Sequence, residues 1–178
     1  MQNIEVELRS FISKERYEDL LKFFKENGKF LREDYQETYY FDTPIDLRIQ
    51  KNNFFSKIWM KKGKIHDEAR EEIEIKFPKE DFEKLERLFL SVGLNVQIKW
   101  FRNRHEFEWN GFAVSIDFTR GYGYIIELEK MWNEEEKDEV IELIKEKFKE
   151  LNIPVTTKEE FDDKYKYYKE NWRSLVNN

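Results

Sequence analysis

Three pairs of glutamates, each pair two residues apart, are the first candidates for chemistry in this sequence. The pairs are Glu5/Glu7, Glu72/Glu74 and Glu127/Glu129. Side chains two positions apart in an extended strand point to the same face, so each pair would place two carboxylates side by side. Like charges repel at that distance unless cations lie among them. Arginines stand on or near the same predicted faces: Arg9, Arg48, Arg70, Arg102 and Arg104.

Clustered carboxylates facing arginines suggest one kind of ligand. Carboxylates bind hard divalent cations, and Mg²⁺ is commonly held by one or two carboxylates together with water and substrate phosphates. Arginine binds phosphate oxygens, often through two hydrogen bonds at once. Acids, arginines and a metal ion together would bind a chain of phosphates and stabilise charge during phosphoryl transfer, with water as the simplest nucleophile.

Strands and helices that would position these residues follow from the apolar pattern. Helical spacing predicts helices after Ser13, Pro78, Asn133 and Thr157, and Asn110–Gly111 is a strong hairpin signal. Strands joined by tight turns are antiparallel. Alternation predicts about eight strands, at residues 3–11, 30–42, 47–51, 54–62, 70–77, 96–109, 112–118 and 124–130.

These elements predict an α+β fold: an antiparallel β-barrel, or tunnel, of about eight strands with a polar charged lumen and flanking helices. The apolar faces of the strands would lie outside, under the amphipathic helices. For any one strand, an alternating charged side also fits a solvated outer face over an ordinary core. The shared acid pairs and the arginines favour the enclosed arrangement, which is costly unless a ligand balances the charges.

Composition limits the class of protein. The chain has 178 residues, which predicts a single domain over residues 1–178. Its 16 Phe, 9 Tyr and 5 Trp argue against disorder, and the lack of cysteine excludes disulfides and thiolate chemistry. No signal peptide or membrane-spanning run is apparent, so we expect a cytoplasmic protein without a membrane partner. The net charge of −6 argues against a nucleic-acid partner.

The ordered series of motifs resembles the CYTH proteins, also called triphosphate tunnel metalloenzymes. "IEVELR" is similar to the ExExK signature of that family, "YYFDTP" to its YFDTP turn, "DLRIQ" to its LRxR strand and "KIWMKKG" to the strand that ends in KG. "REEIEI", "RNR", "SIDFTRGYGYIIELE" and "DKYKYY" continue the series. The family includes class IV adenylyl cyclases, thiamine triphosphatases and inorganic triphosphatases. The resemblance implies an eight-stranded antiparallel tunnel that binds a triphosphate-containing small molecule with Mg²⁺ or Mn²⁺.

The resemblance also implies roles for individual residues. Glu5, Glu7 and Arg9 would be catalytic. Lys62 stands at the lysine of the family's KG strand end and would bind substrate. Lys61 would take that role if the strand register differs by one. The implied metal ligands are Glu5, Glu7, Glu72, Glu74, Asp117, Glu127 and Glu129. The implied substrate-binding residues are Arg48, Lys62, Arg70, Arg102, Arg104 and Lys164.

Two positions depart from the family pattern. Arg9 stands at the lysine of ExExK, and Gln50 stands at the second arginine of LRxR. In the family, that lysine is thought to orient or activate the attacking water. Arginine stays protonated and cannot act as a base, although it can orient water or bind phosphate. The glutamine removes one positive charge from the expected site.

The sequence therefore predicts a metal-dependent triphosphatase that acts on inorganic triphosphate, thiamine triphosphate or a nucleoside triphosphate. Two alternatives remain open: a class IV-type adenylyl cyclase, in which the 3′-hydroxyl of ATP replaces water, and a non-catalytic module that binds polyphosphate or nucleotides. Members of the family are often dimers, so a homodimer is a further expectation.

Overall fold

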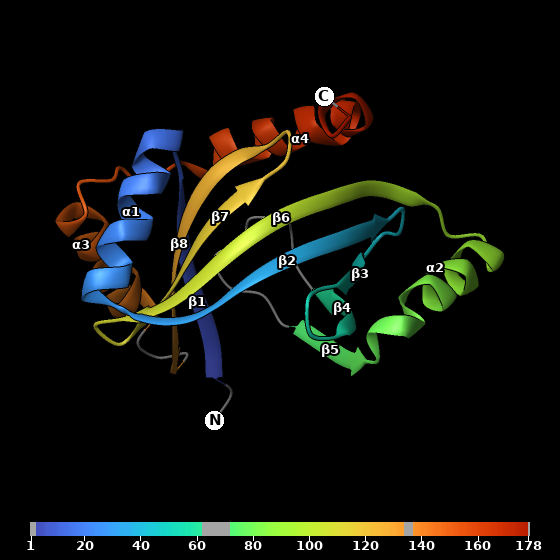
Figure 1. Ribbon diagram of the computed structural model, residues 1–178, viewed down its shortest axis with the longest axis horizontal. Helices are drawn as coiled ribbons and strands as arrows, with labels where there is room; N and C mark the ends of the chain where they lie inside the picture. Colours follow the sequence, from blue (N-terminus) through green and yellow to red (C-terminus); the bar gives the residue numbers. More distant parts are fainter. Residues whose placement is uncertain (1–2, 62–71, 134–136, 178) are drawn as a thin grey trace.

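The computed structural model describes residues 3–61, 72–133 and 137–177 (Figure 1). The strands are β1 (Asn3–Ile12), β2 (Lys29–Phe41), β3 (Asp46–Lys51), β4 (Ser56–Lys61), β5 (Glu72–Phe77), β6 (Val96–Trp109), β7 (Phe112–Thr119) and β8 (Gly123–Asn133). The helices are α1 (Lys14–Asn27), α2 (Phe82–Ser91), α3 (Lys137–Glu150) and α4 (Lys158–Leu175), and a 3₁₀ turn, η1 (Lys79–Asp81), precedes α2.

Local signals in the sequence set several of these boundaries. The Ser13 hydroxyl accepts a hydrogen bond from the Arg16 N–H at 3.1 Å and caps α1. Thr157 caps α4 in the same way, through the N–H of Glu160. Asn110 and Gly111 both have positive φ angles, 51° and 78°, as a two-residue hairpin turn requires. The predicted caps and the predicted hairpin are confirmed.

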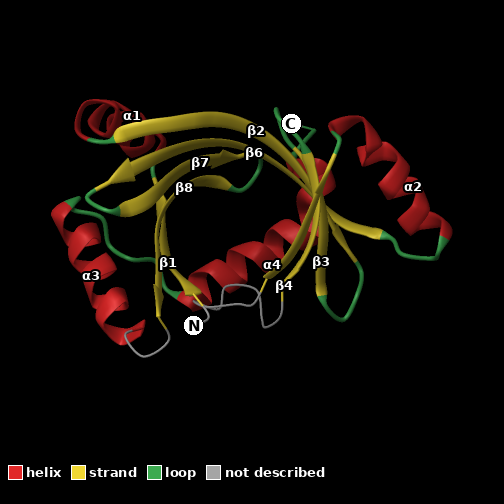
Figure 2. Cartoon of the chain, turned by 90° about the horizontal axis from the view of Figure 1, so that it is seen from below, coloured by secondary structure: helices red, strands yellow, loops and turns green. Residues whose placement is uncertain are grey.

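All eight strands form one antiparallel sheet in the order β1-β8-β7-β6-β2-β3-β4-β5. Figure 2 shows the sheet curving into an arch, with α4 crossing beneath it. The predicted α+β tunnel of eight antiparallel strands is thus confirmed. In the described ranges the edge strands β1 and β5 share no hydrogen-bonded ladder, so the barrel is open along that side.

The apolar side of the sheet lies outside the arch and is covered by helices. Phe24 of α1 and Ile144 of α3 pack against Phe107 of β6 and Ile126 of β8, and all four are fully buried. Each such side chain stabilises the fold by about 1.5–3 kcal/mol relative to an exposed one. Figure 1 shows α1 and α3 at one end of the sheet and α2 at the other, where Phe82 packs in a second cluster. The predicted inversion, apolar outside and polar inside, is present.

The outer face of β5 departs from this pattern. Ile73 and Ile75 are 50% and 62% exposed. The sequence predicted that the apolar faces of the strands would lie under helices, and at β5 no described helix covers these two side chains. The reason is geometric, because α2 packs against β3 further along the sheet.

Helix α4 is fixed across one end of the arch by buried polar contacts. The Tyr168 hydroxyl donates to the Lys99 carbonyl at 2.9 Å, and the Trp172 Nε1–H donates to the Gln97 carbonyl at 2.9 Å. Tyr168 and Trp172 are both buried, so this side of α4 packs against β6. Throughout the described residues, the helices are too short or too polar to cross a membrane.

Candidate active site

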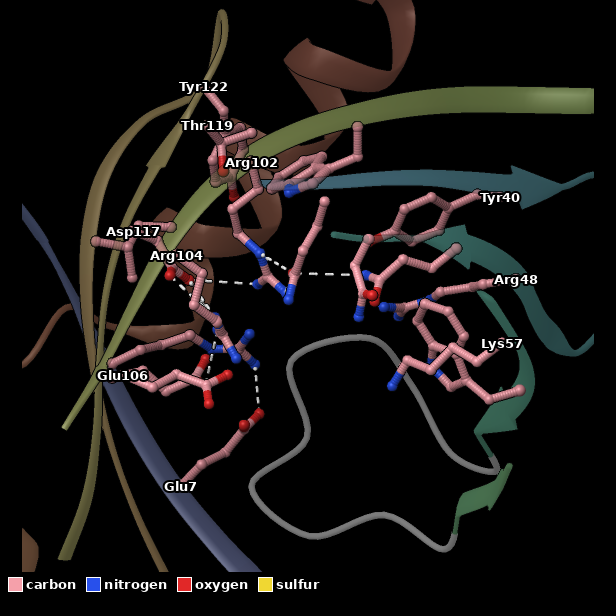
Figure 3. A pocket seen from close by; sticks show the side chains of 18 of the residues that line it. Glu7, Tyr40, Arg48, Lys57, Arg102, Arg104, Glu106, Asp117, Thr119 and Tyr122 are labelled. Atoms are coloured by element: carbon pink, nitrogen blue, oxygen red, sulfur yellow. Dashed lines mark hydrogen bonds and ion pairs between the residues drawn. The ribbon is translucent and has the colours of Figure 1, made fainter. Parts of the chain in front are cut away.

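The concave side of the sheet encloses a cavity of about 300 Å³ (Figure 3). Its described lining is highly charged and contains more cations than acids, although the whole chain carries a net charge of −6. A local excess of positive charge in a partly enclosed site attracts anions. The cationic lining residues are Arg9, Arg32, Arg48, Lys57, Lys61, Arg102 and Arg104, and the acidic ones are Glu7, Glu106, Asp117, Glu127 and Glu129.

On one wall of the cavity, two largely buried arginines share one carboxylate. Arg104 on β6 donates to Asp117 on β7 from Nε to Oδ1 at 2.9 Å and from Nη2 to Oδ2 at 2.7 Å. Arg102, two residues earlier on β6, reaches the same Oδ2 from Nη1 at 3.3 Å. The register places Arg104 directly opposite Asp117, and the alternation of β6 brings Arg102 to the same face.

The two arginines differ in how well their charge is balanced. Burial alone would lower the pKa of Arg104, but Asp117 and Glu127 outweigh it and raise the pKa well above the ordinary value. Glu127 Oε1 lies 3.1 Å from Arg104 Nη2. For Arg102, burial lowers the pKa and the neighbouring charge of Arg104 lowers it further, against the opposing effect of the acids. Arg102 is therefore a largely buried cation whose carboxylate partner, Asp117, is bound mainly by Arg104.

Strands β1 and β8 supply an acidic wall. Their register places Glu7 directly opposite Glu129 and Arg9 directly opposite Glu127. The Arg9 Nη2 lies 3.2 Å from Glu7 Oε1. Carboxylate oxygens are suitable ligands for Mg²⁺ or Mn²⁺. Among the side chains that the structure describes, no three or more acids or histidines converge as a complete metal site.

The opposite wall, on β3 and β4, is basic and aromatic. Figure 3 shows Arg48 and Lys57 on that side, across the cavity from Glu7 and Asp117. The Arg48 guanidinium binds both carboxylate oxygens of Asp46, at 2.6 and 2.5 Å, and lies 4.2 Å from the centre of the Tyr40 ring. These contacts hold the guanidinium in one orientation at the cavity wall.

Most of the predicted site residues with described side chains line this one cavity. They are Glu7, Arg9, Arg48, Arg102, Arg104, Asp117, Glu127 and Glu129. Lys61 also lines it, in agreement with the alternative strand register. Lys62 and Arg70, and the side chains of Glu5 and Glu72, lie outside the described part of the chain.

Two predicted residues lie beside the cavity and are not part of its described lining. The Lys164 ammonium lies 3.9 Å from the centre of the Phe11 ring, and burial lowers its pKa. Glu74 Oε2 lies 2.6 Å from the Nζ of Lys57, a lining residue. Glu74 thus holds the Lys57 ammonium and balances part of its charge at the cavity wall.

Sequence reasoning missed several residues of the cavity. Arg32 and Glu106 form an ion pair across β2 and β6, with Arg32 Nη2 donating to Glu106 Oε1 at 3.0 Å. Gln36, on the same face of β2 as Arg32, accepts from Arg102. The alternation of β2 could have indicated these residues, because Arg32, Gln36 and Tyr40 fall on one face of the strand by a period of two.

Comparison with known proteins agrees with this geometry. The CYTH domain family matches residues 3–161 of the chain. A protein of Methanocaldococcus jannaschii named "Putative adenylate cyclase MJ0240" is 34% identical over 164 residues, which cover 84% of this chain and 90% of that protein.

Solved structures show the same fold. A conserved hypothetical protein of Pyrococcus furiosus superposes with a TM-score of 0.74 at 26% identity, covering 85% of this chain and 94% of that one. HpAC1 of Hippeastrum, a protein described as a putative adenylyl cyclase with a dominant triphosphatase activity, superposes with a TM-score of 0.64 at 20% identity, covering 88% and 93%. With its charged tunnel and a family match along most of its length, the chain belongs to the CYTH family.

Proposed function

We propose that this protein is a divalent-metal-dependent triphosphatase, which hydrolyses a phosphoanhydride bond of a triphosphate bound inside the tunnel. The observation that carries the proposal is the pair Arg102 and Arg104, two largely buried guanidiniums that share Asp117. A buried cation without a carboxylate of its own is costly. A phosphate oxygen is an anion of the right size and geometry to bind a guanidinium and lower that cost.

The shape of the cavity supports an extended polyanion. Cations come from several strands and surround the cavity, with Arg48 and Lys57 on one wall and Arg104 on the opposite wall. A chain of phosphates offers anionic oxygens to cations on both walls, and the arginines would then stabilise the charge that develops on the transferred phosphoryl group.

Mg²⁺ or Mn²⁺ is part of the proposal. Glu7 and Glu129, directly opposite each other on β1 and β8, would hold the ion, with Glu5 two residues along the same strand. These carboxylates fit a metal that is completed by phosphate oxygens and water. When bound, the ion would neutralise phosphate charge and polarise the bond that breaks.

Arg9 has a positioning role in this proposal. Its guanidinium lies 3.2 Å from the Glu7 carboxylate and 5.2 Å from the centre of the Phe161 ring, at the acidic wall. Arginine remains protonated, so Arg9 would orient the attacking water or a phosphate oxygen and would not remove a proton. We expect slower hydrolysis than a lysine at this position would support.

One finding favours an adenylyl cyclase as the second candidate, namely the name of the relative that is 34% identical. In that reaction the 3′-hydroxyl of ATP attacks the α-phosphorus and pyrophosphate leaves. The same arginines and metal would serve it. The two activities differ in their products, so a single assay separates them.

The experiment is an assay of the purified protein with tripolyphosphate, thiamine triphosphate and ATP, each with Mg²⁺ or Mn²⁺. Release of orthophosphate supports the triphosphatase. Pyrophosphate together with cyclic AMP from ATP supports the cyclase, and tight binding without turnover supports a non-catalytic module. Arg104→Ala should raise the substrate concentration needed for half-maximal rate, and wild-type kinetics in that variant would refute the site assignment.

A further inference from the structure

A chain of hydrogen bonds links the loop between β3 and β4 to Arg102. The backbone N–H of Asn53 donates to Asp34 Oδ1 at 3.0 Å, and Gln36 Nε2 donates to Asp34 Oδ2 at 3.0 Å. The other end of the Gln36 amide, Oε1, accepts from Arg102 Nε at 2.9 Å and from Arg102 Nη2 at 2.5 Å. Asp34 is fully buried and Gln36 is 5% exposed. The middle of the chain, Asp34 and Gln36, is therefore shielded from water.

The direction of the Gln36 amide follows from the chemistry of its neighbours. A guanidinium has donors and no acceptor, so the group of Gln36 that faces Arg102 must be the carbonyl oxygen. The NH₂ group then faces Asp34, which accepts it. A second amide, Gln50, donates to Thr38 Oγ1 at 2.8 Å and reaches Gln36 Oε1 at 3.5 Å. Both ends of the Gln36 amide are thus held.

Gln36 fixes the Arg102 guanidinium without neutralising it. The amide oxygen contacts two of the guanidinium nitrogens and so fixes the plane of the group, as a carboxylate would. Unlike a carboxylate, the amide has no net charge. Arg104 is bound by two carboxylates, Asp117 and Glu127, whereas Arg102 reaches only Asp117, from Nη1 at 3.3 Å.

We propose that Gln36 is a positioning residue for triphosphate binding: it orients Arg102 toward the cavity and leaves the positive charge of Arg102 free to bind a phosphate. This inference rests on the proposed function. Asp34 has a supporting part, since it holds the Gln36 amide in the orientation that presents oxygen to Arg102. A glutamate at position 36 would keep an acceptor for Arg102 and neutralise the charge that the ligand needs, but it would lose the hydrogen bond that the Gln36 NH₂ donates to Asp34.

The test measures the dissociation constant of tripolyphosphate by calorimetry, with Mg²⁺ present, for the wild-type protein and a set of variants. Gln36→Glu should weaken binding by about tenfold or more, because a charged hydrogen bond to the ligand is replaced by an internal ion pair. Gln36→Met keeps the net charge and removes the acceptor. Its affinity should fall by less than that of Gln36→Glu, while kcat falls because the guanidinium is no longer fixed.

A matched control adds the same charge elsewhere in the cavity. The Asn52 Oδ1 accepts the N–H groups of Phe54 and Phe55, both at 2.8 Å, and an aspartate can accept both. Asn52 also lines the cavity, and its side-chain oxygen is bound by the backbone of the β3–β4 loop. Asn52→Asp should therefore weaken binding by less than about threefold, as expected for a charge that is not in contact with the ligand-binding arginine.

A double-mutant cycle shows whether Gln36 acts through Arg102. Against an Arg102→Met background, Gln36→Glu should have little further effect on tripolyphosphate binding. Wild-type affinity in Gln36→Glu, an equal loss in the Arg102→Met background, or an equal loss in Asn52→Asp would each overturn the inference. If Gln36→Glu does not fold, unchanged kcat in Gln36→Met overturns it instead.

The same variants distinguish a failure of this inference from a failure of the proposed function. Unchanged tripolyphosphate binding in Arg102→Met would refute the proposed triphosphate site itself. Weakened binding in Arg102→Met with wild-type binding in Gln36→Glu would leave the site intact and refute only the role of Gln36. Variants that lower the melting temperature without changing affinity or kcat would show that Gln36 serves folding alone.

Discussion

Arg104 binds Asp117 through a bidentate ion pair. Its Nε donates to Oδ1 at 2.9 Å, and its Nη2 donates to Oδ2 at 2.7 Å. The Asp117 side chain is 3% exposed and that of Arg104 is 14% exposed. The pair lies on adjacent strands β6 and β7, in the wall of the cavity. It therefore anchors the arginines that the ligand would contact.

Removal of this anchor should destabilise the protein. Asp117→Asn leaves two buried arginines without their shared carboxylate, and we expect the free energy of unfolding to fall by about 3 kcal/mol. Chemical denaturation measures the change. The control is Glu142→Gln, which removes an exposed ion pair with Lys145 and should cost less than about 0.5 kcal/mol. Equal effects in the two variants would contradict the assigned importance of the buried pair.

Tripolyphosphate should partly offset the loss in Asp117→Asn, because its phosphates supply negative charge to the same arginines. We expect the ligand to raise the melting temperature of the variant by more than that of the wild-type protein. An equal shift in both proteins would show that the ligand does not contact this pair.

Stability below neutral pH should depend on Glu127. Burial alone would raise the pKa of this carboxyl, but Arg104, Arg9 and Arg102 outweigh burial and hold the pKa well below its ordinary value of 4.5. Because the folded-state pKa is depressed, the unfolded chain takes up the proton first as the pH falls. The stabilisation is therefore present above pH 4.5 and is lost progressively below it.

Glu127→Gln should flatten that part of the pH profile. The measurement is the free energy of unfolding against pH in the presence of a chelator, so that metal binding does not contribute. Glu18→Gln, at an exposed ion pair with Lys14, should leave the slope unchanged. A slope in Glu127→Gln equal to that of the wild-type protein would contradict the assigned electrostatics.

The Mg²⁺ concentration needed for activity should rise when a carboxylate of the acidic wall is removed. Glu7→Gln removes one carboxylate of the facing pair Glu7 and Glu129, and we expect the Mg²⁺ concentration for half-maximal rate to rise by about tenfold or more. A chelator should abolish activity in the wild-type protein. Glu108→Gln is a control on β6, since Glu108 is exposed and pairs with Lys29. An unchanged Mg²⁺ dependence in Glu7→Gln would exclude Glu7 as a metal ligand.

Arg9→Lys should increase the rate of hydrolysis. Lysine restores the residue of the ExExK motif, and a lysine amine can lose its proton where an arginine cannot. The measurement is kcat with tripolyphosphate and Mg²⁺. Arg9→Met removes the charge and should lower kcat below the wild-type value. If Arg9→Lys leaves the rate unchanged, arginine is sufficient for the role.

By itself, the sequence determined which side chains of a strand share a face. Alternation with a period of two is a local property, so Arg102 and Arg104 had to share a face, as did Glu127 and Glu129. Caps and turns were also local, which is why the starts of α1 and α4 could be predicted from Ser13 and Thr157.

Tertiary structure alone decided which of these groups meet. Contacts across strands depend on register and on the curvature of the whole sheet, which no short segment encodes. Arg102 and Gln36 are 66 residues apart in the chain, and nothing near either one indicates their hydrogen bond. The exposure of Ile75 likewise depends on where α2 docks. The sequence thus provided the charges of the tunnel, and the packing of distant strands determined which of those charges are balanced.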